Sequence, residues 1–280
     1  MHNPVIIIGA PRSGTNILRD TLTVFSEVGT WDCDEIPYIW RYGNKQFPTD
    51  LLTPEMVTPK IKKYIRSQFD KISRKMNCNN IIEKTCANSL RVGYVDKILP
   101  NAKYIFILRN GIDAVNSAMQ RWGSKLSLSY TLKKLKYVPL SNIPYYGFNY
   151  VGNRLYKISN RNRLKLWGPV FIKPNKLEKY SLEEISAMQW VECVTRANES
   201  FEKMNEEKVL RIRYEEFATH PNEITKEIAN FIGFHFDNNI TLPPIKKTSI
   251  GKGFVNLSSS QMNKIIPIVE TTMINNNYTC

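Results

Sequence analysis

Short apolar runs alternate with amphipathic stretches along most of the chain. The first run, Val5–Ile8, is rich in β-branched residues and is bounded by Pro and Gly, a pattern that predicts a strand. Leu18, Leu22 and Phe25 then recur at spacings of four and three residues, which predicts an amphipathic helix. The chain thus begins with a strand and a helix joined by a short loop.

The same alternation continues downstream. Strands that alternate with helices are typical of a parallel, doubly wound sheet, so we expect an α/β fold in which a parallel sheet is flanked by helices in three layers. Further strands are predicted at residues 80–83, 103–108 and 208–213, and helices at residues 60–76, 89–99, 112–122, 181–204 and 221–233.

Two segments lack a sustained period. Residues 30–60 are rich in Pro, Trp and Tyr, which predicts irregular structure lying over a site. Residues 124–180 hold many Lys, Tyr, Asn and Pro residues, and we interpret them as a largely irregular or helical lid inserted on the substrate side. A chain of 280 residues with 42% hydrophobic content can bury a substantial core, so residues 1–280 are expected to form a single domain.

The charge balance is strongly basic. The chain has 39 Lys and Arg against 25 Asp and Glu residues, a formal net charge of +14, which favours anionic ligands. The basic residues are spread along the sequence, and patches such as Lys60–Lys63 and Lys133–Lys136 are better explained as solvated faces than as a nucleic-acid-binding arm. No nucleic-acid partner is expected, although a polyanion-binding module stays open as an alternative.

Cysteine usage and hydropathy indicate the compartment. Five cysteines form no C-x-x-C pair and no metal-like spacing with the three histidines, so we expect reduced thiols and no metal site. No apolar stretch approaches the roughly 20 residues that cross a bilayer, and the N-terminus lacks the pattern of a signal peptide. A cytoplasmic protein without a membrane span is expected, and its oligomeric state is left open.

The loop Gly9–Gly14 contains the first candidate chemistry. Its spacing fits the G-x-x-x-x-G of nucleoside-triphosphate loops, but Thr15 and Asn16 stand where Lys and Ser or Thr should follow. A cation lies inside the loop instead, because Arg12 can bind a phosphate or a leaving oxygen through its planar fork. A helix N-terminus after such a loop also attracts anions. The loop predicts a site for an anion other than a triphosphate, and a tight turn without a ligand is the alternative.

A second pair of residues follows the strand at 103–108. Arg109 stands at its carboxyl end, and Ser117 lies eight residues later in the next helix. Both side chains can point into one crevice at the end of a parallel sheet, where ligands bind in open α/β folds. An arginine and a hydroxyl suit a phosphate group, whereas a capping arginine and an inert serine are the alternative.

Together these two sites resemble the sulfotransferases that use 3′-phosphoadenosine 5′-phosphosulfate (PAPS). Pro11–Thr15 match that family's P-[RK]-S-G-T-T loop, which binds the 5′-phosphosulfate, and Arg109 with Ser117 matches its 3′-phosphate pair. The resemblance covers residues 4–122 and 181–235 and implies a fold similar to P-loop nucleotide kinases. It further includes the stretches 83–91, 99–104 and 213–217.

The resemblance implies a set of donor-binding residues. Asn16 departs from the family's second Thr, but its amide can still donate to a phosphate oxygen. The segment from Gly251 to Gly253 is either the counterpart of the loop that closes over the 3′-phosphate or a flexible turn. The expected residues for PAPS, and for the product 3′-phosphoadenosine 5′-phosphate (PAP), are Arg12, Ser13, Gly14, Thr15, Asn16, Arg109, Ser117, Tyr214, Gly251, Lys252 and Gly253.

The implied reaction is in-line sulfuryl transfer to an acceptor hydroxyl or amine, carried by a carbohydrate, a lipid or another small molecule. Such transfer needs a base for the acceptor proton and positive charge on the leaving oxygen. Arg12 supplies the charge, and Lys84 can contact the sulfuryl group. For the base, Glu35 is favoured over Glu83, and a carboxylate merely paired with a neighbouring cation is the alternative for each.

Other side chains near these motifs have less specific interpretations. Arg41 is a candidate for binding an anionic acceptor. Four aromatic residues either stack on adenine and line an acceptor pocket or belong to the core, and these are Trp31, Tyr38, Trp40 and Trp122. A nucleotide-kinase-like transferase is a further alternative, disfavoured because the loop lysine is absent and no Asp-containing Mg²⁺ motif is evident.

Overall fold

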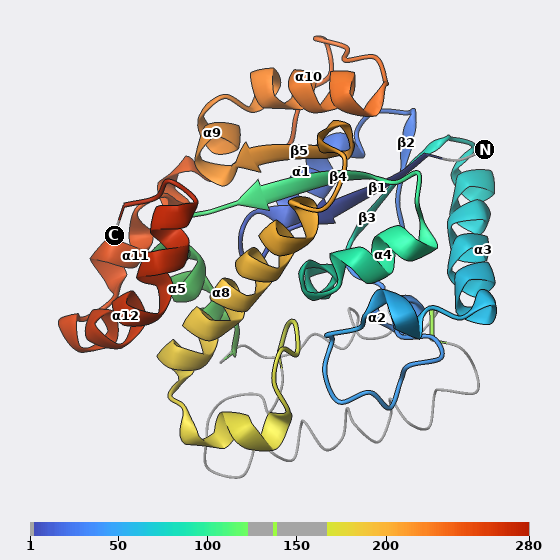
Figure 1. Cartoon of the computed structure of the whole chain (residues 1–280). Coiled ribbons are helices and arrows are strands. Elements are labelled where there is room, and N and C mark those ends of the chain that lie inside the picture. Colours follow the sequence, from blue (N-terminus) through green and yellow to red (C-terminus); the bar gives the residue numbers. More distant parts are fainter. Residues whose placement is uncertain (1–2, 123–136, 139–166, 280) are drawn as a thin grey trace.

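Parallel strands form the centre of the structure, a computed structural model that describes residues 3–122, 137–138 and 167–279 (Figure 1). In this part of the chain the sheet has five strands in the order β2-β3-β1-β4-β5, and every neighbouring pair is parallel. The strands are β1 (Asn3–Ile8), β2 (Val28–Gly29), β3 (Asn80–Lys84), β4 (Lys103–Leu108) and β5 (Val209–Arg213).

Helices connect these strands and extend beyond the last one. The α-helices are α1 (Thr15–Leu22), α2 (Pro37–Trp40), α3 (Pro59–Met76), α4 (Val92–Ile98), α5 (Gly111–Trp122), α8 (Leu182–Phe201), α9 (Tyr214–Thr219), α10 (Pro221–Ile232), α11 (Lys252–Asn256) and α12 (Ser259–Asn275). The short 3-10 helices are η1 (Pro54–Met56), η2 (Cys86–Leu90), η5 (Pro174–Lys179), η6 (Glu206–Lys208) and η7 (Lys247–Ser249).

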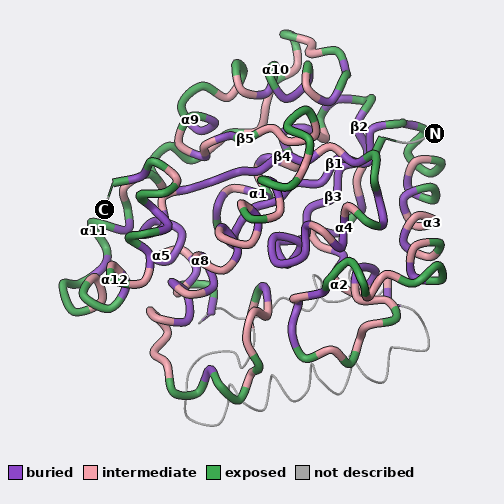
Figure 2. The backbone as a smooth tube through the Cα atoms, viewed as in Figure 1, coloured by how far each residue is buried: buried purple, intermediate pink, exposed green. Residues whose placement is uncertain are grey.

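The alternation of side chains along β1 divides the core into two layers. Val5 and Ile7 pack with the apolar faces of α1, α9 and α10, whereas Ile6 and Ile8 pack with those of α3, α4, α5, α8 and α12. All four side chains are fully buried or nearly so, because β1 lies at the middle of the sheet (Figure 2). The predicted three-layer α/β fold, similar to P-loop nucleotide kinases, is therefore confirmed.

The carboxyl ends of the central strands lead directly into the candidate motifs. β1 continues into the loop Gly9–Gly14, β3 ends at Lys84, and β4 ends one residue before Arg109. Because the paired strands are parallel, these three ends lie at the same edge of the sheet. The fold thus brings together loops that are up to one hundred residues apart in the sequence.

Several elements differ from the expectations. The predicted helix over 89–99 begins as the 3-10 helix η2, and α4 proper starts only at Val92. The segment 30–60 contains α2 and η1, and its residues Trp31 and Trp40 are buried in the core. Most of the predicted lid at 124–180 lies outside the described residues, although 167–180 includes η5. No helix within the described ranges is long and apolar enough to cross a membrane.

Candidate active site

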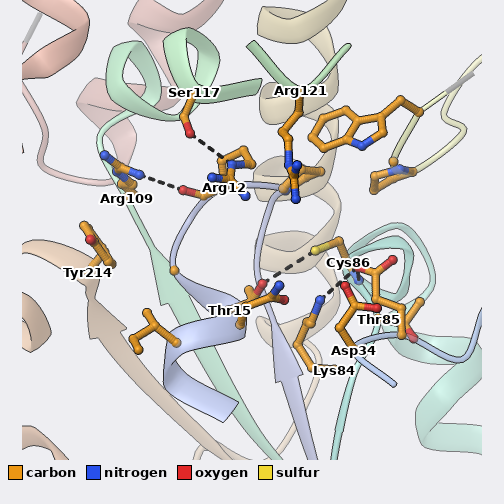
Figure 3. Close-up of a pocket in the computed structure, with 18 of the residues that line it drawn as sticks. Arg12, Thr15, Asp34, Lys84, Thr85, Cys86, Arg109, Ser117, Arg121 and Tyr214 are labelled. Carbon is orange, nitrogen blue, oxygen red and sulfur yellow. Dashed lines mark hydrogen bonds and ion pairs between the residues drawn. The ribbon is translucent and has the colours of Figure 1, made fainter. Parts of the chain in front are cut away.

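A cleft of about 880 Å³ opens at the carboxyl edge of the sheet (Figure 3). Ten of the predicted site residues line it, namely Arg12, Gly14, Thr15, Asn16, Glu35, Lys84, Arg109, Ser117, Tyr214 and Lys252. Four others, Ser13, Glu83, Gly251 and Gly253, do not line it. The structure therefore brings the two predicted anion motifs and the favoured base into one cavity.

The loop between β1 and α1 has an unusual backbone. Arg12 has a φ of 70° and Gly14 a φ of 92°, both in the left-handed region. A side chain on Gly14 would also collide with the ring of Tyr214, since an added Cβ would lie 2.3 Å from Tyr214 Cδ2. No side chain caps the N-terminus of α1. Its first N–H groups are consequently available to an anion in the cleft.

Arg12 connects the two predicted anion sites. Its Nε donates a hydrogen bond to Ser117 Oγ at 2.9 Å, and its backbone carbonyl accepts one from Arg109 Nη1 at 2.9 Å (Figure 3). The pKa of Arg12 is lowered, first by burial and then by the nearby charges of Arg121 and Arg109. The site is thus strongly electropositive before any ligand enters.

Arg109 is fixed on several sides. Its guanidinium carbon lies 4.6 Å from the ring centre of Tyr214, and its Nη2 donates to the carbonyl of Ser249 at 2.7 Å. The hydroxyls of Tyr214 and Ser249 are hydrogen-bonded to each other at 2.7 Å. These contacts hold both predicted donor-binding side chains, Arg109 and Tyr214, against the segment that precedes α11.

Asp113 docks the Gly-containing loop onto α5. Its carboxylate accepts the backbone N–H of Gly251 at 2.8 Å and that of Gly253 at 2.7 Å, and it lies 3.9 Å from Arg109 Nη2. An added Cβ on Gly253 would lie 2.7 Å from the carbonyl of Ile112, so this contact requires glycine. The loop is therefore a docked element beside Arg109, and its Lys252 side chain lines the cleft.

Glu35 and Lys84 form an ion pair in the part of the cleft at the end of β3. Lys84 Nζ lies 3.0 Å from Glu35 Oε1, which also accepts the backbone N–H of Cys86 at 3.2 Å. Burial acts to lower the pKa of Lys84, but Glu35, Cys86 and Asp34 outweigh it and the pKa is raised. Lys84 therefore remains a cation although its side chain is only 2% exposed.

Cys86 completes the contact between this ion pair and the loop. Its Sγ lies 3.6 Å from Thr15 Oγ1 (Figure 3). Burial raises the pKa of the Cys86 thiol to about 12, so the thiol stays protonated at neutral pH.

The structure does not support the prediction of Glu83 as a base. Its carboxylate accepts hydrogen bonds from Thr85 Oγ1 at 2.5 Å and Asn88 Nδ2 at 2.8 Å, and only 1% of the residue is exposed. Burial raises its pKa to about 7. Thr85 Oγ1 in turn accepts the N–H of Ile36 at 3.1 Å. Glu83 thus lies behind the cleft wall, where it accepts a hydrogen bond from the lining residue Thr85.

Of Arg41 and the four aromatic residues considered above, only Tyr38 lines the cleft. Arg41 Nη1 donates to Asp50 Oδ1 at 2.8 Å and does not line the cleft, so the suggested contact with an anionic acceptor is not formed from this position. Trp31, Trp40 and Trp122 are buried in the core, whereas Tyr38 lines the cleft. Lining residues that sequence reasoning did not single out include Arg121, Trp167, Lys246 and Ser249.

Comparison with known proteins identifies the family. The family model described as "Sulfotransferase family" matches residues 4–143, which is half of the chain and includes both anion motifs. The chain belongs to the sulfotransferase family. No curated protein sequence matches it.

Solved sulfotransferases share the fold at low sequence identity. The sulfotransferase domain of the curacin biosynthetic pathway is 12% identical, with a TM-score of 0.56 over 100% of this chain and 99% of that one. A sulfotransferase from Alicyclobacillus acidocaldarius is 14% identical, with a TM-score of 0.53 over 100% and 98%. Mouse SULT7A1, solved in complex with PAP, is 14% identical, with a TM-score of 0.50 over 98% and 86%. At these identities the similarity establishes the fold of this family member and no more.

Proposed function

We propose that this sulfotransferase family member transfers a sulfuryl group from PAPS to an acceptor hydroxyl or amine. The single observation that carries the proposal is the position of Arg12, which is hydrogen-bonded both to Ser117 and, through its carbonyl, to Arg109. One cleft therefore offers two adjacent sites for anions, as a donor with phosphates at both its 3′ and 5′ positions requires. The separate alternatives of a triphosphate loop or a nucleic-acid surface do not explain this pairing.

The residues of the cleft fit such a donor. Arg109, which lines the cleft, has a buried Nε without a hydrogen-bond partner within the described residues, and the N-terminus of α1 is uncapped. Unpaired buried donors of this kind are costly unless a ligand satisfies them. Arg12 with the loop would hold the 5′-phosphosulfate, Arg109 with Ser117 the 3′-phosphate, and Tyr214 would lie near the adenine. Lys252 adds positive charge at the same end of the cleft.

The chain's own residues can accept the acceptor's proton and stabilise the negative charge that develops during transfer. The bound donor supplies a sulfuryl group already activated by its bond to a phosphate oxygen. That sulfur–oxygen bond breaks while a bond from sulfur to the acceptor oxygen or nitrogen forms, and the acceptor's proton passes to the carboxylate of Glu35. Arg12 and Lys84 stabilise the negative charge on the leaving and nonbridging oxygens. Positioning and electrostatics dominate such a reaction, as they do in phosphoryl transfer.

Binding of PAP tests the donor half of the proposal. Isothermal titration calorimetry should give binding to the wild-type chain that Arg12→Ala and Arg109→Ala each weaken by about tenfold or more, because each removes a charged partner of a phosphate. Arg74→Gln is a matched control. Arg74 lies exposed on α3, so this substitution removes the same charge outside the cleft. Absence of PAP binding by the wild-type chain would sink the proposal.

Turnover tests the catalytic half of the proposal. Release of PAP from PAPS is measured with saccharides, phenols, lipids and amines as acceptors, and sulfated products are identified by mass spectrometry. We expect transfer to a small molecule or saccharide, and we place the protein in the cytoplasm because its described cysteines are free thiols. Binding of PAP without transfer to any acceptor class would contradict the catalytic part alone.

A further inference from the structure

One face of α5 lines the cleft with a stripe of polar residues. Asp113, Asn116, Ser117, Gln120 and Arg121 all line the cavity. Their spacings of three, one, three and one residues place them on one side of a helix. The first members are assigned by the contacts above, since Asp113 docks the Gly251 loop and Ser117 anchors Arg12. The end of the stripe, at Arg121, has no role in the proposed donor site.

Arg121 lies beyond the residues that would hold the donor. It follows Ser117 by four residues, which corresponds to about 6 Å along the helix axis, on the side away from Asp113. Figure 3 shows its side chain pointing into the cleft beside Arg12. Trp167 also lines the cleft, and its ring centre lies 6.0 Å from that of Trp122, the residue that follows Arg121 on α5. The carbonyl of Trp167 accepts a hydrogen bond from Gln189 at 2.9 Å.

The charges that line the cleft favour an anion. Three of the lining carboxylates are held by other groups: Glu35 by Lys84, Asp50 by Arg41 and Arg91, and Asp113 by Arg109 and the loop. Arg121 lies close enough to Arg12 to repel its charge, since the pKa of Arg12 is lowered first by burial and then by Arg121. The cations that line the described part of the cleft are Arg12, Lys84, Arg109, Arg121, Lys246 and Lys252, against Asp34, Glu35, Asp50 and Asp113.

We propose that Arg121 binds an anionic group of the acceptor, a carboxylate, phosphate or sulfate that lies near the hydroxyl or amine to be sulfated. The planar guanidinium can hold any of these groups through two parallel hydrogen bonds. The inference rests on the proposed function and adds the class of acceptor to it. Arg121 is then a specificity-determining residue, distinct from the arginines that hold the donor.

The test compares matched acceptors on chain saturated with PAP. The pairs are para-hydroxybenzoate with para-hydroxybenzamide, glucuronic acid with glucose, and phosphoserine with serine amide, and binding is measured by calorimetry and by ligand-observed NMR. In at least one pair the wild-type chain should bind the anionic member about tenfold more tightly than the neutral one, as expected for a charge-assisted contact. Arg121→Gln should abolish that preference, Arg121→Lys should retain part of it, and Arg74→Gln should leave it unchanged.

Each result separates this inference from the proposed function. Failure of PAP to bind the wild-type chain removes the proposed function and the inference together. When PAP binds, equal binding of both members in every pair, or binding of neither, overturns the inference alone. A loss of PAP affinity in Arg121→Gln as large as that in Arg109→Ala would also overturn it, because Arg121 would then belong to the donor site.

Discussion

Arg12 Nε and Ser117 Oγ are 2.9 Å apart although the two residues are separated by 105 positions in the chain. The contact joins the loop after β1 to the middle of α5. It therefore connects the two predicted anion motifs that line the cleft. Arg12 makes this contact from a left-handed backbone conformation, with a φ of 70°. Ser117 therefore orients the Arg12 guanidinium, in addition to the contact proposed for its hydroxyl with the donor.

Ser117→Ala tests this double role. Loss of one hydrogen bond to a charged group should raise the dissociation constant for PAP by about threefold to tenfold, because Arg12 is less well oriented and one ligand contact is lost. Calorimetry measures the change, and Ser67→Ala on α3, whose hydroxyl bonds to the carbonyl of Tyr64, is the control. Equal PAP affinity in Ser117→Ala and the wild-type chain would show that the contact does not orient Arg12.

Asp50→Asn should destabilise the fold strongly. Asp50 Oδ1 accepts hydrogen bonds from Arg41 at 2.8 Å and the fully buried Arg91 at 3.0 Å, and Oδ2 accepts the N–H of Val170 at 2.9 Å. Removal of one charge from a buried ion pair leaves the partner uncompensated, so we expect a loss of about 3–5 kcal/mol in the free energy of unfolding measured with urea.

The control for that loss is an exposed ion pair. Glu192 pairs with Arg196 on α8, and their side chains are 37% and 42% exposed. Glu192→Gln should therefore change the free energy of unfolding by only about 0–1 kcal/mol. Similar losses in the two variants would mean that the buried network contributes no more than a surface pair.

Glu83 should make stability depend on pH. Its pKa is raised by burial from 4.5 to about 7 in the folded chain, so the fold binds its proton more tightly than the unfolded chain does. The contribution of Glu83 to stability is then fully present below about pH 4.5 and is lost as the pH rises through about 7, a change of about 3 kcal/mol.

Glu83→Gln checks this sign, because glutamine cannot ionise. Urea unfolding of the wild-type chain and the variant at several pH values between 4.5 and 8 gives the difference in stability at each pH. The difference should shift in favour of the variant as the pH rises, whatever its value at low pH. A difference that stays constant across this range would contradict a raised pKa for Glu83.

The sequence predicts the loop and the strand ends well because their chemistry is local. Val5–Ile8 has few alternatives to a buried strand, and Gly14 marks a turn that needs a positive φ. By contrast, α12 was not predicted, because Pro267 interrupts its stripe of Ile265 and Val269 and proline usually ends a helix. Here the helix continues through it.

Residues whose roles depend on distant partners were harder to predict. Arg41 follows Trp40 in the sequence and suggests a ligand contact, but the fold places Asp50 beside it. Trp167 comes from a segment without periodicity, so no local pattern places it in the cleft. Arg121 carried a usable signal, since it continues the spacing of four residues from Asp113 to Ser117 on a helix that was itself predicted.

Glu35→Gln should slow transfer strongly and leave donor binding intact. The change removes the carboxylate that would accept the acceptor's proton, so PAP release from PAPS with acceptor present should fall by about 10²–10⁴-fold. PAP affinity should change by no more than about threefold, because the residues proposed to hold the phosphates are untouched.

Asp34→Asn is the matched control, since Asp34 also lines the cleft and stands next to Glu35 in the chain. Its turnover should stay within about tenfold of the wild-type rate, because its carboxylate is not needed as a base in the proposed reaction. The pH profile separates a base from a group that only holds Lys84 in place: below the pKa of the base the wild-type rate should fall with pH, and the residual rate of Glu35→Gln should lose that dependence. If Glu35→Gln keeps both the wild-type rate and the fall in rate at low pH, another residue must be the base.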